Sequence, residues 1–196
     1  MTALARIPGP HRFTYDEVRR MVTTGAIDAK APLELLDGEL IDMPSEGFPH
    51  VSLKARLTQF LNLELKAPWL VVPDSTLYLS PQDAPEPDIY VVDETRFSFP
   101  VVPDSIALIV EVADTSLAYD LERKAPKYAQ YALAEYWVVD VQSRETTVFT
   151  QPRPGGYASR VPAPFEQALT PLRLPEAALR IGDLRGWDGA REVGAP

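Results

Sequence analysis

Hydrophobic residues follow two different spacings along this chain, and these spacings predict both helices and strands. Between Gly47 and Lys66, apolar side chains recur at three- and four-residue steps, which is the pattern of a helix lying against a sheet. The runs Ile89–Val92 and Ile106–Val112 are almost wholly apolar and short enough to be buried strands. Shorter runs predict further strands at 33–36, 39–43, 70–72, 76–79, 136–141 and 146–150.

Two local signals fix elements near the N-terminus. Thr14 and Glu17 have the spacing of a capping box, which predicts a helix that starts after Thr14 and runs to about Thr23. The dipeptide Asp37-Gly38 separates two apolar runs and tolerates a positive φ, so it predicts a tight hairpin.

A further helix is predicted at 121–133, where Pro126 conflicts with a regular helical start. Proline removes one helical hydrogen bond unless it lies in the first turn. Two arrangements therefore stay open. Either the helix is interrupted at Pro126, or its regular part begins only near Ala125 and Lys124 lies on the entry turn.

These elements together predict an α/β (α+β) fold, in which a mixed β-sheet core is flanked by a few helices. We expect one domain over residues 1–196, with its core at about 14–150. The segment 151–190 is predicted to be an extension that opens with a turn between edge strands at 151–156, and 191–196 a frayed tail.

Composition agrees with one soluble globular domain, because the 196 residues are 45% hydrophobic and 24% charged. No run approaches the roughly 20 apolar residues that span a bilayer, and the first ten residues do not resemble a signal peptide. We therefore expect a cytoplasmic protein that does not bind membranes. The chain has no cysteine and two histidines, so a metal here should be hard and oxygen-ligated.

The net charge of −9 argues against a general nucleic-acid coat protein, which needs an excess of basic residues to neutralise phosphates. It is compatible with a metal-dependent nuclease, which concentrates acidic groups at its site and needs only a local basic rim. Each basic side chain taken singly is more simply explained as a charge or histidine on a helix face. The candidates for a nucleic-acid rim are His50, Lys54, Arg56, Arg123 and Lys127.

Two carboxylates stand out because each lies at the end of a strand predicted to be buried. Asp88 precedes one strand, Glu111 lies near the end of the next, and Lys124 follows on the predicted helix. If the two carboxylates lie about 5 Å apart on adjacent strands, their repulsion is roughly 3 kcal/mol at an effective dielectric constant near 20. A divalent metal or Lys124 would relieve this repulsion, so the pattern predicts a cation site.

Five short motifs occur in a fixed order along the chain, namely Glu34–Leu40, Leu108–Val112, Asp120–Lys124, Lys127–Ala129 and Glu135–Asp140. Their content and order resemble the bacterial family labelled Uma-type putative restriction endonuclease. The order of aspartate, glutamate and lysine also resembles the wider PD-(D/E)xK nuclease superfamily. The resemblance covers the chain from about Thr14 to about Phe149.

This resemblance implies a restriction-endonuclease-like core and a metal-dependent endonuclease that hydrolyses phosphodiester bonds in DNA. Asp88 and Glu111 would hold Mg²⁺ or Mn²⁺, which usually takes only one or two carboxylates and keeps several waters. Lys124 would orient the attacking water or neutralise the developing charge. Glu39 would add a third carboxylate, although it can equally be an exposed charge of the hairpin.

The chain departs from the superfamily at Ala113, where the superfamily usually has its lysine. This is why the role passes to Lys124, with Lys127 in reserve. Asp120 is expected to cap the helix or to pair with Lys124 at four-residue spacing. Without a metal, Glu111 and Lys124 would form a buried ion pair.

Two other functional classes also stay open. One is a catalytically silent nuclease-fold protein that binds nucleic acid or regulates, and the other is a different hydrolase that uses the same carboxylates. A homodimer is expected if both strands of a duplex are cut, because a two-fold axis supplies two sites.

Overall fold

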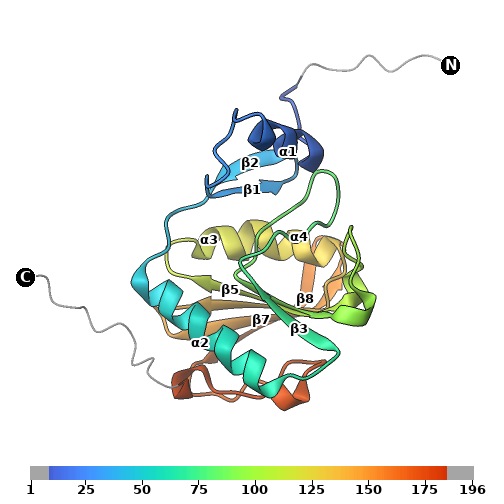
Figure 1. The fold of residues 1–196 in the computed structure, drawn as a ribbon. Coiled ribbons are helices and arrows are strands. Elements are labelled where there is room, and N and C mark those ends of the chain that lie inside the picture. Colours follow the sequence, from blue (N-terminus) through green and yellow to red (C-terminus); the bar gives the residue numbers. More distant parts are fainter. Residues whose placement is uncertain (1–8, 185–196) are drawn as a thin grey trace, which may run out of the picture.

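The computed structural model describes residues 9–184, and its largest feature is a six-stranded sheet with helices on both faces (Figure 1). A smaller unit, made of the first helix and a two-stranded hairpin, lies over the helical layer on one of these faces (Figure 1). The elements are α1 (Tyr15–Thr23), β1 (Leu33–Leu36), β2 (Glu39–Asp42), α2 (Phe48–Glu64), β3 (Trp69–Pro73), β4 (Ile89–Asp93), β5 (Ile106–Ala113), α3 (Leu117–Tyr119), a π-helical turn (Asp120–Lys124), α4 (Ala125–Gln130), β6 (Glu135–Asp140), β7 (Glu145–Arg153) and β8 (Gly156–Pro164).

The sheet is mixed, with strand order β3-β4-β5-β6-β7-β8. Only β5 and β6 pair in parallel, and the chain between them supplies α3 and α4. All eight residues of β5 are buried, as the apolar run in the sequence predicts. The register of β4 and β5 places Ile89 opposite Val110, so the preceding Asp88 comes next to the following Glu111.

Two hydrophobic cores fill the two faces of this sheet. On one face, α2 buries Leu53, Leu57 and Leu61 against β4, β5 and β6, which confirms the predicted helix and its apolar side. On the other face, Tyr128 of α4 packs edge-on against Tyr136 of β6 at a ring-centroid distance of 4.9 Å. The sheet is therefore a rigid platform from which buried side chains can be held in fixed positions.

The N-terminal unit follows the predicted capping and turn signals. The side chain of Thr14 accepts a hydrogen bond from the backbone N–H of Glu17, and the carboxylate of Glu17 accepts one from the backbone N–H of Thr14. The hairpin turns at Asp37 (φ 54°) and Gly38 (φ 71°), both in the left-handed region. A Cβ on Gly38 would lie 2.8 Å from Arg12 Cβ, so this position requires glycine.

The helical segment before β6 resolves the conflict at Pro126. The chain enters through α3 and a π turn, and the regular helix α4 begins at Ala125 with Pro126 in its first turn. Since proline has no N–H to donate, the wider π turn accommodates it without leaving a broken hydrogen bond inside α4. Lys124 lies at the end of the π turn, as the second of the two expected arrangements has it.

Two predictions need correction or restriction. The expected strand at 76–79 is wrong, because these residues pair with no strand: the N–H of Leu77 donates to the carbonyl of Pro85, and the carbonyl of Tyr78 accepts from the N–H of Val101. The turn predicted after residue 150 joins β7 to the edge strand β8, and the chain then continues in short 3₁₀ turns up to Leu184. The predicted frayed tail at 191–196 lies outside the described residues. Within residues 9–184, no helix combines the length and the apolar character needed to cross a bilayer.

Candidate active site

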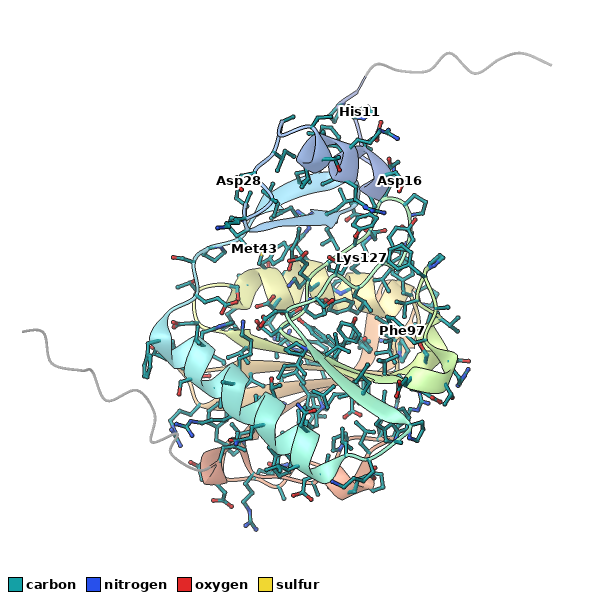
Figure 2. The ribbon with its side chains drawn as sticks, viewed as in Figure 1. His11, Asp16, Asp28, Met43, Phe97 and Lys127 are labelled. Atoms are coloured by element: carbon teal, nitrogen blue, oxygen red, sulfur yellow. The ribbon has the colours of Figure 1, made fainter. Side chains whose placement is uncertain are left out.

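A cavity of about 420 Å³ opens where the hairpin, the start of α2 and the ends of β4 and β5 meet. The segment from Met43 to Gly47, between β2 and α2, forms one wall (Figure 2). The charged side chains around the cavity are Glu34, Glu46, Lys54, Asp74, Glu86, Asp88, Glu111, Asp114, Asp120 and Lys124, and His50 lies among them. Such a concentration of carboxylates in one concave place is the first sign of a cation site.

The structure brings Asp88 and Glu111 together, as the sequence predicts. The backbone N–H of Asp88 lies 3.4 Å from Glu111 Oε2, and the N–H of Val112 donates to Asp88 Oδ2 at 2.7 Å. Burial by itself raises the pKa of Asp88, but the hydrogen bond and charge of His50 and the Val112 N–H hold it below the usual value. Asp88 is therefore a buried carboxylate that stays ionised.

Lys124 is enclosed by three carboxylates. Its Nζ atom lies 2.8 Å from Glu34 Oε1, 2.9 Å from Glu111 Oε1 and 3.8 Å from Asp120 Oδ1, and only 1% of its side chain is exposed. Burial alone would lower the pKa of Lys124, but the three carboxylates raise it well above the usual value. Lys124 thus remains an ammonium ion.

The carboxylates around this lysine are strained electrostatically, because one positive charge faces three acids. Burial raises the pKa of Glu111 well above its usual range and that of Asp120 to about 6. Tyr128 donates its hydroxyl to Glu111 Oε1 at 3.1 Å, and Ser116 donates to Asp120 Oδ2 at 2.6 Å. With all three acids ionised this cluster would carry more negative charge than Lys124 balances, and the raised pKa values of Glu111 and Asp120 reflect that excess.

A second cluster comes from α2. His50 Nε2 lies 3.1 Å from Asp88 Oδ2, while Lys54 Nζ lies 2.7 Å from Glu46 Oε1, 2.6 Å from Asp74 Oδ1 and 3.5 Å from Asp88 Oδ1. Burial lowers the pKa of His50 and of Lys54, but their carboxylate partners outweigh it and raise both above the usual values. Both residues were expected on an outer rim; the structure buries them in the cavity wall.

The residues present fit a divalent metal ion. One ligand atom each from Glu46, His50 and Asp88 can be chosen so that all three lie within 4.8 Å of one another. His50 Nδ1 is buried without a hydrogen-bond partner, although it lies 3.3 Å from Glu46 Oε2. A nitrogen of this kind has room for a metal bond, and its neighbours are the oxygen ligands that hard divalent ions take. Glu111 adjoins this triad through Asp88.

Four of the expected residues, Glu39, Arg56, Arg123 and Lys127, lie elsewhere. Glu39 is half exposed and binds Arg12 and Arg123 instead of lining the cavity. Glu39 pairs with Leu36 beside the turn of the hairpin. Glu34 lies farther from the turn, and it is Glu34 that faces Lys124. Lys127 lies beneath the hairpin on the α4 side (Figure 2).

Lys127 and Arg123 therefore contribute to a different surface. Lys127 Nζ lies 2.5 Å from Asp37 Oδ1 and 3.3 Å from Asp83 Oδ1. Both basic residues stabilise the hairpin through its acidic groups, and neither reaches the cavity. Arg56, the other basic residue considered for a rim, does not line it either.

The sequence analysis assigned no role in the site to Glu34, Glu46 or Asp74. Glu34 was detectable in principle, because it is a carboxylate inside the four-residue apolar strand β1, where it is 2% exposed. Glu46 lies four residues before His50, just ahead of the first turn of α2, and its Oε2 lies 3.3 Å from His50 Nδ1. The sequence does not single out Asp74 as a site residue. It follows β3 with a left-handed φ of 47°, and an aspartate in such a position is typical of a turn.

A mixed sheet that brings an aspartate and a glutamate together from neighbouring strands, with a lysine from the following helical segment paired to the glutamate, is a restriction-endonuclease-like arrangement. The chain belongs to the Uma2 family, whose description is "Putative restriction endonuclease" and whose model matches residues 16–182. The resemblance noted in the sequence and the predicted fold class are both confirmed.

One solved structure shares this fold over most of the chain. The crystal structure of a putative nuclease belonging to DUF820 from Anabaena variabilis ATCC 29413 matches with a TM-score of 0.71 and 15% identity, over 89% of this chain and 98% of that one. The type IIG restriction endonuclease BpuSI matches with a TM-score of 0.37 and 21% identity, over 55% of this chain and 12% of that one. No curated protein matches the chain.

Proposed function

We propose that this protein is an endonuclease that uses Mg²⁺ or Mn²⁺ to hydrolyse phosphodiester bonds in DNA. The observation that carries the proposal is the meeting of Asp88, Glu111 and Lys124 in one cavity. Membership of the family described as "Putative restriction endonuclease" and the fold shared with the putative nuclease from Anabaena variabilis both support it. A carboxylate pair can hold a metal ion, and an ammonium beside it can stabilise negative charge that develops on a phosphate.

The metal would be held by Asp88 together with Glu46, His50 and Glu111. When bound, such an ion supplies a nucleophilic hydroxide and stabilises charge on the phosphate. His50 binds Asp88 through Nε2 and leaves Nδ1 without a hydrogen bond, so its imidazole has one free coordinating position. The Val112 N–H donates to Asp88 Oδ2 and so fixes that oxygen. The other oxygen, Oδ1, faces Lys54.

Lys124 would position the water that attacks the phosphate. Its ammonium is fixed by Glu111 and Glu34 at contact distance, so it cannot leave the cavity wall to search for substrate. A fixed ammonium beside a metal-binding carboxylate lowers the cost of bringing a hydroxide and an anionic phosphate together. Because Lys124 Nζ lies 2.9 Å from Glu111 Oε1, the charge of the lysine acts directly on a carboxylate of the proposed metal site.

The test begins with calorimetric binding of Mn²⁺, followed by cleavage of supercoiled plasmid in Mg²⁺ or Mn²⁺. Asp88→Asn should lose most of the metal affinity and all detectable cleavage. Glu135→Gln is the matched control, because Glu135 is equally buried but binds Trp137 and the Leu172 N–H outside the cavity. Cleavage by Asp88→Asn at the wild-type rate, with the protein folded, would refute the assignment.

A nuclease-fold protein without turnover is the second candidate. It is favoured by the complete enclosure of Lys124 by three carboxylates and by Ala113 at the usual lysine position. The same experiment separates the two candidates. Metal binding that depends on Asp88, without cleavage of any DNA substrate, would identify the silent form.

A further inference from the structure

The imidazole of His50 has a buried nitrogen that forms no hydrogen bond. His50 lies in the first turn of α2, lines the cavity and is 7% exposed, and its Nδ1 atom has no hydrogen-bond partner among residues 9–184. Buried polar atoms are almost always paired, because an unpaired one loses its hydration without compensation. An unpaired nitrogen in the wall of an acidic cavity therefore points to a ligand that binds there.

The neighbours of this ring determine which of its nitrogens carries the proton. Asp88 Oδ2 accepts a hydrogen bond from the N–H of Val112 at 2.7 Å and lies 3.1 Å from His50 Nε2. Since an ionised carboxylate can only accept, the proton of a neutral imidazole lies on Nε2 and the lone pair on Nδ1. Metal-binding histidines characteristically donate their second N–H to a carboxylate in this way, which holds the ring in place. His50 is thus oriented as a metal ligand.

Glu46 supplies an oxygen beside this nitrogen. Its Oε2 atom lies 3.3 Å from His50 Nδ1, and its side chain is 41% exposed, so it can adjust to a cation. Two ligands in adjacent positions around one ion lie about 3 Å apart when each bond is about 2.1 Å long. Lys54 contacts both oxygens of Glu46 and also has Asp74 as a partner at 2.6 Å. A cation beside Glu46 therefore leaves the ammonium of Lys54 with a carboxylate of its own.

We infer that His50 binds the metal directly through Nδ1 and thereby makes this site select Mn²⁺ over Mg²⁺. Mg²⁺ prefers oxygen ligands and gives up its waters reluctantly, whereas imidazole nitrogen is a ligand of the first-row transition metals. The sequence predicted a hard metal with oxygen ligands, and a nitrogen ligand shifts that preference. The inference rests on the proposed function for the presence of a metal, and it decides between the two ions that the proposal allows.

A simpler role for His50 is to hold Asp88 in position without contact to the metal. Replacing His50 would then weaken the binding of both ions by the same factor, because Asp88 serves either ion alike. The loss of a direct nitrogen ligand has a different consequence, because it weakens Mn²⁺ binding and leaves Mg²⁺ binding almost unchanged. The ratio of the two affinities therefore separates a metal ligand from a positioning residue.

The test measures this ratio in the full chain without DNA. Binding of Mn²⁺ is followed by the electron paramagnetic resonance signal of the free ion, and Mg²⁺ is then added as a competitor. The wild type should prefer Mn²⁺. His50→Asn places an amide oxygen near the position of Nδ1, and it should lower the ratio of Mn²⁺ to Mg²⁺ affinity by about tenfold or more.

A second measurement on the wild type does not depend on any variant. Pulsed electron paramagnetic resonance of the bound Mn²⁺ should show coupling to a directly bonded nitrogen nucleus, and this coupling should disappear in His50→Asn. His11→Asn is the matched control, because His11 is the other histidine of the chain, its side chain is 64% exposed, and it contacts Glu17 outside the cavity. This control should keep both the affinity ratio and the nitrogen coupling.

A wild type without preference for Mn²⁺, or a bound Mn²⁺ without nitrogen coupling, would overturn the inference. An equal loss of both affinities in His50→Asn would overturn it as well and assign His50 to positioning Asp88. In each of these cases, metal-dependent cleavage of plasmid by the wild type would still support the proposed function. If neither ion binds to the wild type, the inference fails together with the proposed metal site.

Discussion

Replacing Lys124 by methionine should destabilise the protein far more than replacing its partner Glu111 by glutamine. Methionine has nearly the shape of lysine without its charge, so Lys124→Met leaves Glu34, Glu111 and Asp120 buried without a cation. Glu111→Gln removes one of three acids, and Lys124 keeps the other two. The two variants therefore change the same contact with opposite effects on the charge balance.

The distances give the scale of the difference. A contact of 2.8 or 2.9 Å between opposite charges is worth roughly 6 kcal/mol at an effective dielectric constant of 20, before the loss of hydration is counted. Removing one partner of a buried ion pair typically costs about 3–5 kcal/mol. We expect a loss of this size for Lys124→Met and a change within about 1 kcal/mol, of either sign, for Glu111→Gln.

The assay is urea unfolding at neutral pH followed by circular dichroism, with a chelator present so that metal binding does not contribute. The two variants should differ by at least about 2 kcal/mol in the free energy of unfolding. Equal losses would show that the Glu111–Lys124 contact acts as an isolated pair, and the three-carboxylate description of the site would be wrong.

Three further predictions concern the N-terminal unit, and each is read from the free energy of unfolding. Thr14→Ala removes the acceptor for the Glu17 N–H and should cost about 1 kcal/mol. Gly38→Ala should cost about 1–3 kcal/mol, because φ is 71° and a Cβ meets Arg12; a neutral result would contradict the turn geometry. Burial raises the pKa of Asp83, but the hydrogen bonds from Tyr131 and the Asp37 N–H and the charge of Lys127 together outweigh it and keep this pKa below its usual value. Its stabilisation is therefore present above about pH 4 and lost as the pH falls through the lowered value, so the stability difference between wild type and Asp83→Asn should shrink in acid.

The elements that local sequence determines were predictable. The capping box at Thr14, the turn at Gly38 and the apolar spacing of α2 are each signalled by residues within one short segment, and each is found in the structure. The prediction of a strand at 76–79 was wrong because strand formation depends on residues that are distant in the sequence. An apolar run becomes a strand only if a partner strand lies beside it, and here Leu77 meets a proline-rich loop instead.

The positions of the site residues could be predicted only where the pairing of strands determines them. The register of β4 and β5 follows from two apolar runs, and it brings Asp88 to Glu111. Which hairpin glutamate faces Lys124 depends on how the whole hairpin lies over α3 and α4, and that is a tertiary property. The sequence alone therefore points to Glu39, which binds Arg123, and gives no reason to prefer Glu34, which binds Lys124.

The distribution of charge also removes the objection that an acidic protein makes a poor nuclease. Eight carboxylates and two lysines line the cavity, which gives it a formal charge of −6 with His50 neutral. The rest of the chain then carries −3 of the total of −9. The negative charge is concentrated where a divalent cation would neutralise part of it, and the remaining surface is close to neutral. An acidic total is therefore compatible with the proposed metal site, because a bound metal would change the charge that an approaching phosphate meets.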